Sequence, residues 1–292
     1  MITRSLSFGS IRSVLPALAL LFGAIADPVL ALQVRVVPQE ARLGDTISVT
    51  VETDRTQTET PTVRYDGRNF AAFEVRPGAY RALLPTTPLD RPGKRTITVE
   101  TEEGDAIADV FVGDREFPFQ AITLSPSVAA IEGTDYEFNL MDKFRAAATP
   151  EQYWNGAFID PSDGWVSTVF GVRRSYNGVF AENYYHRGID YAAPTGAPVR
   201  AAANGRVALV GYQADGFELH GNAVGIDHGQ GVTTTYIHLS AIEVQPGQIV
   251  RAGDIIGRVG STGISTGPHL HWGLFVNGES VDPLPWLEGR IE

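Results

Sequence analysis

The stretch Gly221–Ser240, GNAVGIDHGQGVTTTYIHLS, decides the fold class of the C-terminal half of this 292-residue chain. Two runs of alternating side chains flank the glycine-rich Gly229–Gly231, and this pattern predicts two antiparallel strands joined by a tight turn. Val224 and Ile226 fall on one face of the first strand, because successive side chains of a strand point to opposite faces. On the second strand, the residues expected to share a face are Val232, Thr234, Tyr236 and His238.

The chain keeps this glycine-rich, strand-like character from Gly164 onward. The segments 248–261, QIVRAGDIIGRVGS, and 269–280, HLHWGLFVNGES, repeat short apolar runs between turns. No helical periodicity of any length interrupts them. We therefore expect a compact all-β domain over residues 164–288.

Residues 32–114 also predict strands and form a separate part of the pattern. The segments 45–53, DTISVTVET, and 94–102, KRTITVETE, alternate apolar and polar residues, and 108–113, ADVFVG, closes the series. Short alternating strands between turn residues are typical of an antiparallel β-sandwich. This part contains no cluster of histidines or acids, so we expect its role to be positional rather than chemical.

Residues 115–163 read as a connector with one helix. Thr134 followed by Glu137 has the spacing of a capping box, and the segment 135–148, DYEFNLMDKFRAAA, would form the helix behind it. Thr149-Pro150 followed by Gln152 predicts a second, short helical turn, with proline at the first helical position. The whole chain is therefore expected to be mainly β.

Residues 1–31 have the pattern of a signal peptide. Basic residues precede an apolar stretch at about 14–25, and small residues define two possible cleavage positions, after Ala26 or after Ala31. We favour cleavage after Ala31. The apolar stretch is short for a membrane span, which needs about 20 residues. The expectation is an exported protein of the periplasm or cell envelope, with no membrane span after cleavage.

Composition limits the chemistry that the chain can perform. The formal net charge is −11, which argues against a nucleic-acid partner, because phosphate binding needs a basic surface. The chain has no cysteine, which removes disulfides, thiol nucleophiles and cysteine-ligated zinc. A tight metal site in this chain must therefore use histidine, aspartate or glutamate.

The histidines are the strongest chemical signal. All six lie at or after residue 186, although structural histidines would be expected to scatter along the chain. His269 and His271 are two residues apart and would project from one face of a strand. His186 and Asp190 have an even spacing and can lie on one face of an extended segment. Two imidazoles and one carboxylate form a known catalytic zinc set, which keeps a fourth position open for water.

These blocks resemble the M23 family of zinc peptidases, of the lysostaphin and LytM type. The resemblance is carried by 186–190, HRGID, by 221–240, and by 253–274, GDIIGRVGSTGISTGPHLHWGL, in the order and spacing of the family. The segment 170–177, FGVRRSYN, is similar to the one that usually precedes the first zinc ligand. Residues 32–114 resemble more loosely the Ig-like β domains that precede this peptidase in some exported bacterial proteins.

The resemblance implies roles for five residues. His186, Asp190 and His271 match the three ligands of one Zn²⁺ per chain, and His269 and His238 match the two catalytic histidines. It also implies a two-sheet antiparallel β domain with a groove over the metal, and peptidoglycan peptides as substrate. His269 is favoured as the base, with His238 orienting water or stabilising the oxyanion, but the reverse assignment stays open.

Two functions remain to be weighed. The first is an exported zinc metalloendopeptidase that hydrolyses peptide bonds in peptidoglycan through a zinc-activated water. The second is a non-cleaving LytM-type module that activates a wall amidase or serves as a scaffold for division or envelope machinery. The N-terminal β domain could position the peptidase domain, cover its groove, or bind an envelope protein partner. Outside the site, His228 is expected in the hairpin, His220 on the surface or rim, and Arg173 in an ion pair or against a substrate carboxylate.

Overall fold

The computed structural model describes residues 32–54 and 56–291. The predicted signal peptide, residues 1–31, lies outside the described residues. Strands dominate, and most of them pair antiparallel, so the predicted mainly β class is confirmed. None of the helices in the described part has the length and apolar character needed to cross a lipid bilayer.

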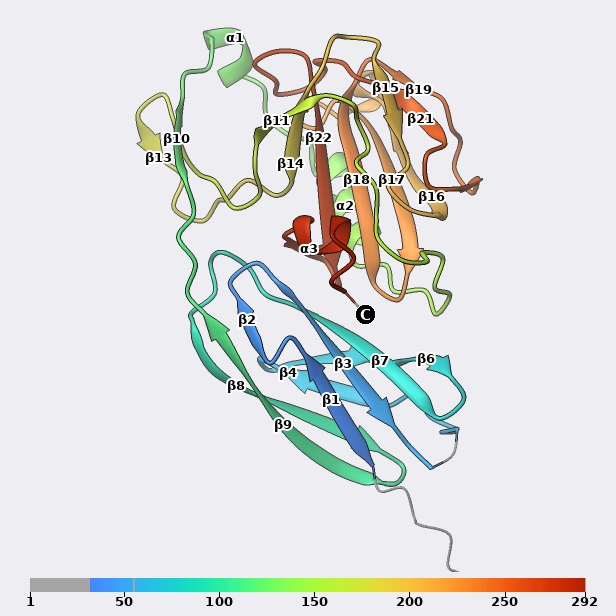
Figure 1. The fold of residues 1–292 in the computed structure, drawn as a ribbon. Coiled ribbons are helices and arrows are strands. Elements are labelled where there is room, and N and C mark those ends of the chain that lie inside the picture. The colour runs from blue at the N-terminus through green and yellow to red at the C-terminus, as the bar shows by residue number, and fades with distance from the viewer. Residues whose placement is uncertain (1–31, 55, 292) are drawn as a thin grey trace, which may run out of the picture.

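The N-terminal unit, residues 32–113, is a pair of sheets packed face to face (Figure 1). One sheet has the strand order β1-β3-β7-β6 and the other has the order β2-β9-β8-β4-β5. The first sheet consists of β1 (Gln33–Val37), β3 (Thr46–Glu52), β6 (Phe73–Arg76) and β7 (Ala79–Pro85). The second consists of β2 (Glu40–Arg42), β4 (Thr62–Tyr65), β5 (Arg68–Ala71), β8 (Gly93–Thr101) and β9 (Gly104–Gly113).

The core of this unit follows the alternation seen in the sequence. Ile47, Val49 and Val51 of β3 and Ile97 and Val99 of β8 are all completely buried. They belong to one apolar cluster between the two sheets. Burying such a side chain contributes roughly 1.5–3 kcal/mol, so these inward-facing rows of side chains stabilise the unit.

The C-terminal unit is built on one long antiparallel sheet with the order β11-β14-β22-β18-β17-β16-β20, to which β23 pairs through β22. Its strands are β11 (Trp165–Thr168), β14 (Ile189–Ala192), β16 (Gly205–Gly211), β17 (Asn222–Gly229), β18 (Val232–Leu239), β20 (Ile249–Val250), β22 (His269–Val276) and β23 (Glu279–Val281). A smaller sheet contains β15 (Pro198–Arg200), β19 (Ala241–Ile242) and β21 (Ile255–Arg258). The hairpin predicted around Gly229–Gly231 is therefore present as β17 and β18.

The connector is part of the C-terminal unit rather than a free linker. Strand β10 (Phe119–Ile122) pairs parallel with β12 (Arg173–Tyr176), which also pairs with β13 (Val179–Phe180). Helix α2 (Asp135–Arg145) packs against β16 and β18. Its Met141 and Phe144 share a buried cluster with Leu209 and Phe217.

The helix predictions for the connector were right once and wrong once. Helix α2 has the predicted capping box, in which the Thr134 hydroxyl accepts from Glu137 N and the Glu137 carboxylate accepts from Thr134 N. The turn predicted after Thr149-Pro150 is not helical. Its backbone pairs with the hairpin instead, because Gln230 N donates to Thr149 O and Tyr153 N donates to His228 O. Two short helices, α1 (Pro126–Ala129) and α3 (Leu284–Leu287), were not predicted.

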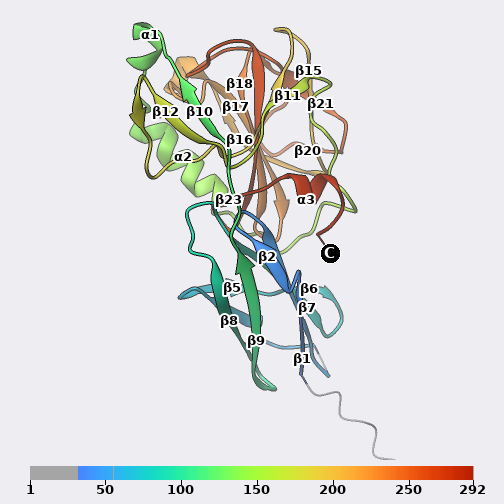
Figure 2. The same ribbon diagram turned by 60° about the vertical axis from the view of Figure 1, so that its left-hand side comes forward.

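The two units are joined by specific contacts at the end of the long sheet (Figures 1 and 2). Arg81 of β7 donates to the side chains of Gln152 and Gln230, and Trp286 Nε1 donates to Thr46 Oγ1. Leu83 of the N-terminal unit lies in the main apolar cluster of the C-terminal unit. These contacts fix the N-terminal unit on one end of the C-terminal unit.

Candidate metal centre and groove

Two neighbouring strands bring the predicted site residues together. Strands β14 and β22 pair antiparallel, and their register places Asp190 directly opposite His271. His269 and His271 both face a groove, while Leu270 and Trp272 between and after them are completely buried in the core. The predicted arrangement of the two histidines on one face of a strand is therefore what the structure contains.

His186 reaches the same point from the loop before β14. Its backbone N donates to Val172 O, and two residues further on Gly188 lies against β22. A side chain at Gly188 would place its Cβ only 2.2 Å from Trp272 O. Glycine therefore allows the chain to pass close to β22 between the two residues that converge, His186 and Asp190.

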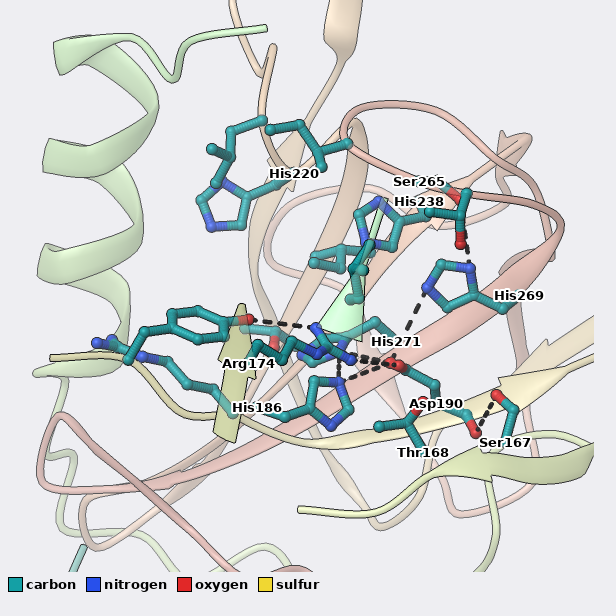
Figure 3. A pocket seen from close by; sticks show the side chains of 18 of the residues that line it. Ser167, Thr168, Arg174, His186, Asp190, His220, His238, Ser265, His269 and His271 are labelled. Atoms are coloured by element: carbon teal, nitrogen blue, oxygen red, sulfur yellow. Dashed lines mark hydrogen bonds and ion pairs between the residues drawn. The ribbon is translucent and has the colours of Figure 1, made fainter. Parts of the chain in front are cut away.

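Three acceptor atoms meet in this cluster (Figure 3). His186 Nε2 is 2.9 Å from Asp190 Oδ1 and 3.0 Å from His271 Nδ1, and His271 Nδ1 is 2.8 Å from Asp190 Oδ1. His186 Nδ1 donates to Val169 O at 2.8 Å, so the neutral ring presents a lone pair at Nε2. This group of three residues has the geometry to hold a metal ion.

The protonation of the cluster suits a cation. Burial alone would raise the pKa of Asp190, but His186 and His271 hold it well below its usual range. Burial lowers the pKa of His271 to about 4, against the opposing pull of Asp190. A carboxylate and two neutral imidazoles are the ligand forms that zinc takes. The residues therefore fit a zinc ion by donor chemistry and by position.

Two further histidines flank the cluster. His269 Nε2 lies 3.9 Å from Asp190 Oδ1, and the rings of His238 and His269 are 4.9 Å apart. His269 Nδ1 donates to Gly267 O and His238 Nδ1 donates to Thr262 O, each at 2.8 Å. Burial, with His269 nearby, holds the pKa of His238 well below its usual range. His238 is therefore neutral, and its Nε2 is left with a lone pair.

The predicted orientation of His238 was wrong for a specific reason. Simple alternation placed it on the face of Tyr236, but Tyr236 lies in the core and bonds through its hydroxyl to Ala202 N. His238 instead lines the groove together with Thr235 and Ile237. Its φ of +65° is a left-handed conformation, which breaks the alternation at the end of β18.

The cluster lies in a groove of about 980 Å³. Strands β14, β18 and β22 form its floor, and β10, β12 and helix α2 contribute to its walls. The loop Ile264–Pro268 lines it beside His269. Within the described residues, no lining residue precedes Gln120, so the N-terminal unit does not cover the groove in this structure.

His220 was expected on the surface or the rim of the site, and it lies at the groove but is buried. It is only 6% exposed, lines the groove, and donates from Nδ1 to Glu137 Oε2 at 2.8 Å. The sequence contained no local signal for this pair, because Glu137 is 83 residues away. In the sequence, Glu137 was interpreted only as part of the capping box. In the structure its carboxylate also accepts from Leu219 N and His220 N.

Arg174 is a second residue that sequence reasoning did not select. Its Nη2 lies 3.4 Å from Asp190 Oδ2, while Nε donates to Gln120 Oε1. Arg174 thus holds the carboxylate oxygen that does not face the histidines and ties the connector to the site. Arg173, which was considered for substrate binding, donates to Glu182 O and does not line the groove. His228 is buried in the hairpin, between Asn204 O and Thr234 Oγ1.

The His-Asp-His group therefore lies in a groove of an antiparallel β domain, in a position to hold a metal ion. Residues 184–283 match Peptidase family M23, and the chain contains a domain of that family. The match begins two residues before His186 and ends twelve residues after His271, so it encloses the whole cluster.

Known proteins similar to this chain carry peptidase names. It is 52% identical over 119 residues to the DD-carboxypeptidase/endopeptidase Mpg of Neisseria meningitidis, which is 41% of this chain and 26% of that protein. It is 41% identical over 118 residues to the peptidoglycan DD-endopeptidase ShyC of Vibrio cholerae, which is 40% of this chain and 26% of that protein. The chain thus spans about a quarter of the length of these curated relatives.

A solved structure resembles most of the chain. A Pseudomonas aeruginosa protein assigned to peptidase M23 aligns over 85% of this chain and 94% of its own, with a TM-score of 0.62 and 25% identity. Because this coverage exceeds the C-terminal unit, the similarity includes part of the N-terminal half.

Proposed function

We propose that this protein is an exported zinc metalloendopeptidase that hydrolyses peptide bonds in peptidoglycan. In this proposal His186, Asp190 and His271 hold one Zn²⁺, and His269 and His238 are the catalytic histidines. Residues 32–114 and 164–288 are proposed as the β-sandwich and peptidase domains, joined by the connector 115–163. The names of the relatives, two of which are peptidoglycan DD-endopeptidases of Vibrio cholerae, support the substrate class.

The observation that carries the proposal is the convergence of three acceptors in an open groove. His186 Nε2, His271 Nδ1 and Asp190 Oδ1 lie within 3.0 Å of one another, and no positively charged side chain lies among them. Arg174 contacts only the other carboxylate oxygen. Zinc bound there would supply a Lewis acid that polarises the scissile carbonyl and acidifies a water molecule.

The protein's own residues provide the proton transfer. His269 presents Nε2 to the groove because Nδ1 is engaged by Gly267 O, so this nitrogen can take the proton of the attacking water. His238 is fixed in the same way by Thr262 O, and its Nε2 accepts a hydrogen bond from that water. The protonated His269 then donates to the leaving amine. Since His238 presents an acceptor, the geometry favours water orientation over oxyanion stabilisation for this residue.

Burial limits the contact of the site histidines with water. His186 and His238 are buried, and His269 and His271 are partly buried. Electrostatic interactions are stronger in such surroundings than in bulk water. A peptide in extended conformation could lie along the groove between α2 and the loop Ile264–Pro268.

The test uses residues 32–292 and purified bacterial sacculi. After treatment with chelator and re-addition of zinc, released fragments are separated by chromatography and identified by mass. The proposal predicts zinc-dependent loss of cross-linked peptides with the glycan strands intact. Zinc bound at one ion per chain with no cleavage would contradict it and would favour the non-cleaving module.

Substitution of His269 separates the catalytic role from the metal role. His269→Ala should keep its zinc and lose turnover by about 10²–10⁴-fold, the range typical of general acid–base groups. His228→Asn changes a histidine outside the groove and should leave turnover in the folded protein unchanged. Equal turnover in wild type and His269→Ala would remove His269 from the mechanism.

A further inference from the structure

The side of the groove next to α2 carries two arginines that the proposed mechanism does not use. Arg145, the last residue of α2, and Arg187, next to His186, both line the groove. The other charged side chains there are Arg174, which is paired with Asp190, and Asp142. A protein with a net charge of −11 thus has an excess of positive charge on this wall.

Arg145 is buried without a strong acceptor. Its side chain is only 14% exposed, and its Nε has no hydrogen-bond partner. Nη1 is 3.8 Å from the carboxylate of Asp142, which is 79% exposed and therefore strongly screened by water. Burial, with the charge of Arg187 nearby, lowers the pKa of Arg145 to about 10. Holding a guanidinium in this state is costly unless an anion completes its surroundings.

The remaining contacts of Arg145 hold it in position rather than neutralise it. Nη2 donates to His220 Nε2 at 3.4 Å, and His220 Nδ1 donates to Glu137, whose carboxylate already accepts from three backbone N–H groups. The guanidinium also stacks 4.6 Å from the ring centroid of Phe275. Glu137 and His220 are thus positioning residues that fix the orientation of the Arg145 guanidinium against the groove.

We propose that Arg145 and Arg187 form a carboxylate-binding subsite, which holds a free carboxylate of the peptide substrate while the bond beside the metal is cut. This inference rests on the proposed function, because it names the part of a peptidoglycan peptide that the groove recognises. Arginine suits the task, since its planar fork matches a carboxylate with two parallel hydrogen bonds. Arg187 is exposed and lines the same groove, with its guanidinium over the Tyr185 ring.

The test measures binding, so that it does not depend on turnover. Zinc-loaded full-length chain carrying His269→Ala is titrated by calorimetry with synthetic stem tetrapeptides. In each member of the series one carboxylate is replaced by a carboxamide. The subsite predicts that one replacement weakens binding by about 10–100-fold, as expected for hydrogen bonds to a charged group. Adding Arg145→Gln should weaken the all-carboxylate peptide by a similar factor and leave the sensitive carboxamide unchanged.

Two more variants keep the inference falsifiable if Arg145→Gln disturbs the fold. Arg187→Gln changes an exposed side chain and should remove part of the same discrimination, while Arg251→Gln, an exposed arginine outside the groove, should remove none. The inference is overturned if no replacement affects binding. It is also overturned if the arginine variants bind the carboxylate and the carboxamide peptides more weakly by the same factor. A preference for the carboxylate that persists unchanged in every arginine variant would assign that preference to the zinc and would overturn the inference as well.

The outcome is separable from that of the proposed function. Discrimination that depends on Arg145 and Arg187, in a wild-type protein that does not cleave sacculi, would uphold the subsite and reject the peptidase. Zinc-dependent cleavage with no such discrimination would uphold the peptidase and reject the subsite.

Discussion

The two β units of this molecule use the same strand pattern for different purposes. In the N-terminal unit the inward-facing residues of β3 and β8 are apolar, and all six histidines of the chain lie outside it. In the C-terminal unit the strands β14, β18 and β22 have one face in the core and the other in a groove with His269, His271 and Asp190. In both units the alternation of side chains provides the buried core. In the C-terminal unit the opposite face of the same strands carries the site residues.

The difference lies in departures from regular strand geometry. His238 has a left-handed backbone. At position 188 only glycine lets the chain beside His186 lie this close to β22, because a Cβ there would clash with Trp272 O. Such departures cost stability and are kept where the surroundings fix them. The N-terminal unit shows the simpler case, in which the strands only form a core and an end surface that docks on Trp286 and Gln230.

The largest effect on stability is expected from removing the connector. It lies between the two units in the sequence but is part of the C-terminal unit in the fold. A chain that begins at Asp160 lacks Met141, Phe144, Trp154 and Phe158, all of which are buried in the C-terminal unit. Loss of one large core side chain costs about 3–5 kcal/mol, so this chain should not fold cooperatively. A chain that begins at Phe119 keeps these residues and should fold. Circular dichroism during thermal unfolding distinguishes the two, and a cooperative transition for the Asp160 chain would contradict this account.

A smaller effect is expected from pH, through His228 in the C-terminal unit. Burial lowers its pKa to about 4, although Asn204 O and Asp227 favour the charged form. Because the unfolded chain binds the proton with an ordinary pKa near 6.5, the stability is fully present above that value and is lost as the pH falls toward 4. The difference corresponds to about 3 kcal/mol. Denaturant unfolding of wild type and His228→Asn between pH 4 and 7 measures it.

The control for that prediction compares how steeply the free energy of unfolding changes with pH, rather than its absolute value. His228→Asn lowers stability at every pH, since the hydrogen bonds to Asn204 O and Thr234 Oγ1 change. Its free energy of unfolding should nevertheless fall less steeply than that of wild type between pH 6.5 and 4. Parallel slopes would show that His228 does not set the pH dependence.

The smallest effect concerns the helix cap that the sequence predicted. Thr134→Ala removes the hydroxyl that accepts from Glu137 N and also donates to Gly216 O. Loss of such a cap typically costs about 1 kcal/mol. Urea unfolding should detect this change, and Thr134→Ser, which keeps the hydroxyl, should recover most of it. An unchanged free energy of unfolding in Thr134→Ala would show that this cap does not help to hold α2.

How much of this structure could be predicted depended on the range of the interactions. Alternation within β3, β8, β17 and β22 was local, and it predicted the strands and the shared face of His269 and His271. The helical turn after Thr149 was predicted from local capping signals, but hydrogen bonds to the hairpin at Gln230 replaced it. Propensity is a weak preference, and such tertiary contacts override it.

The parts of the site that were missed depend on distant partners or on unusual backbone. His220 is held in place by the hydrogen bond that it donates to Glu137, 83 residues away, and a sequence pattern of a few residues cannot reveal this. Arg174 is near Asp190 because β12 lies beside the site and Gln120 holds its Nε. The left-handed φ of His238 has no signature in the sequence TYIHLS.

The most direct test of the central claim is the zinc content of matched histidine variants. Metal bound per chain is measured by atomic emission after dialysis, for wild type, His271→Ala, His269→Ala and His220→Ala. The account predicts about one zinc in wild type, His269→Ala and His220→Ala, and nearly none in His271→Ala, because of the three substituted histidines only His271 belongs to the convergent acceptors. Wild-type levels of zinc in folded His271→Ala would contradict the assignment of the metal centre.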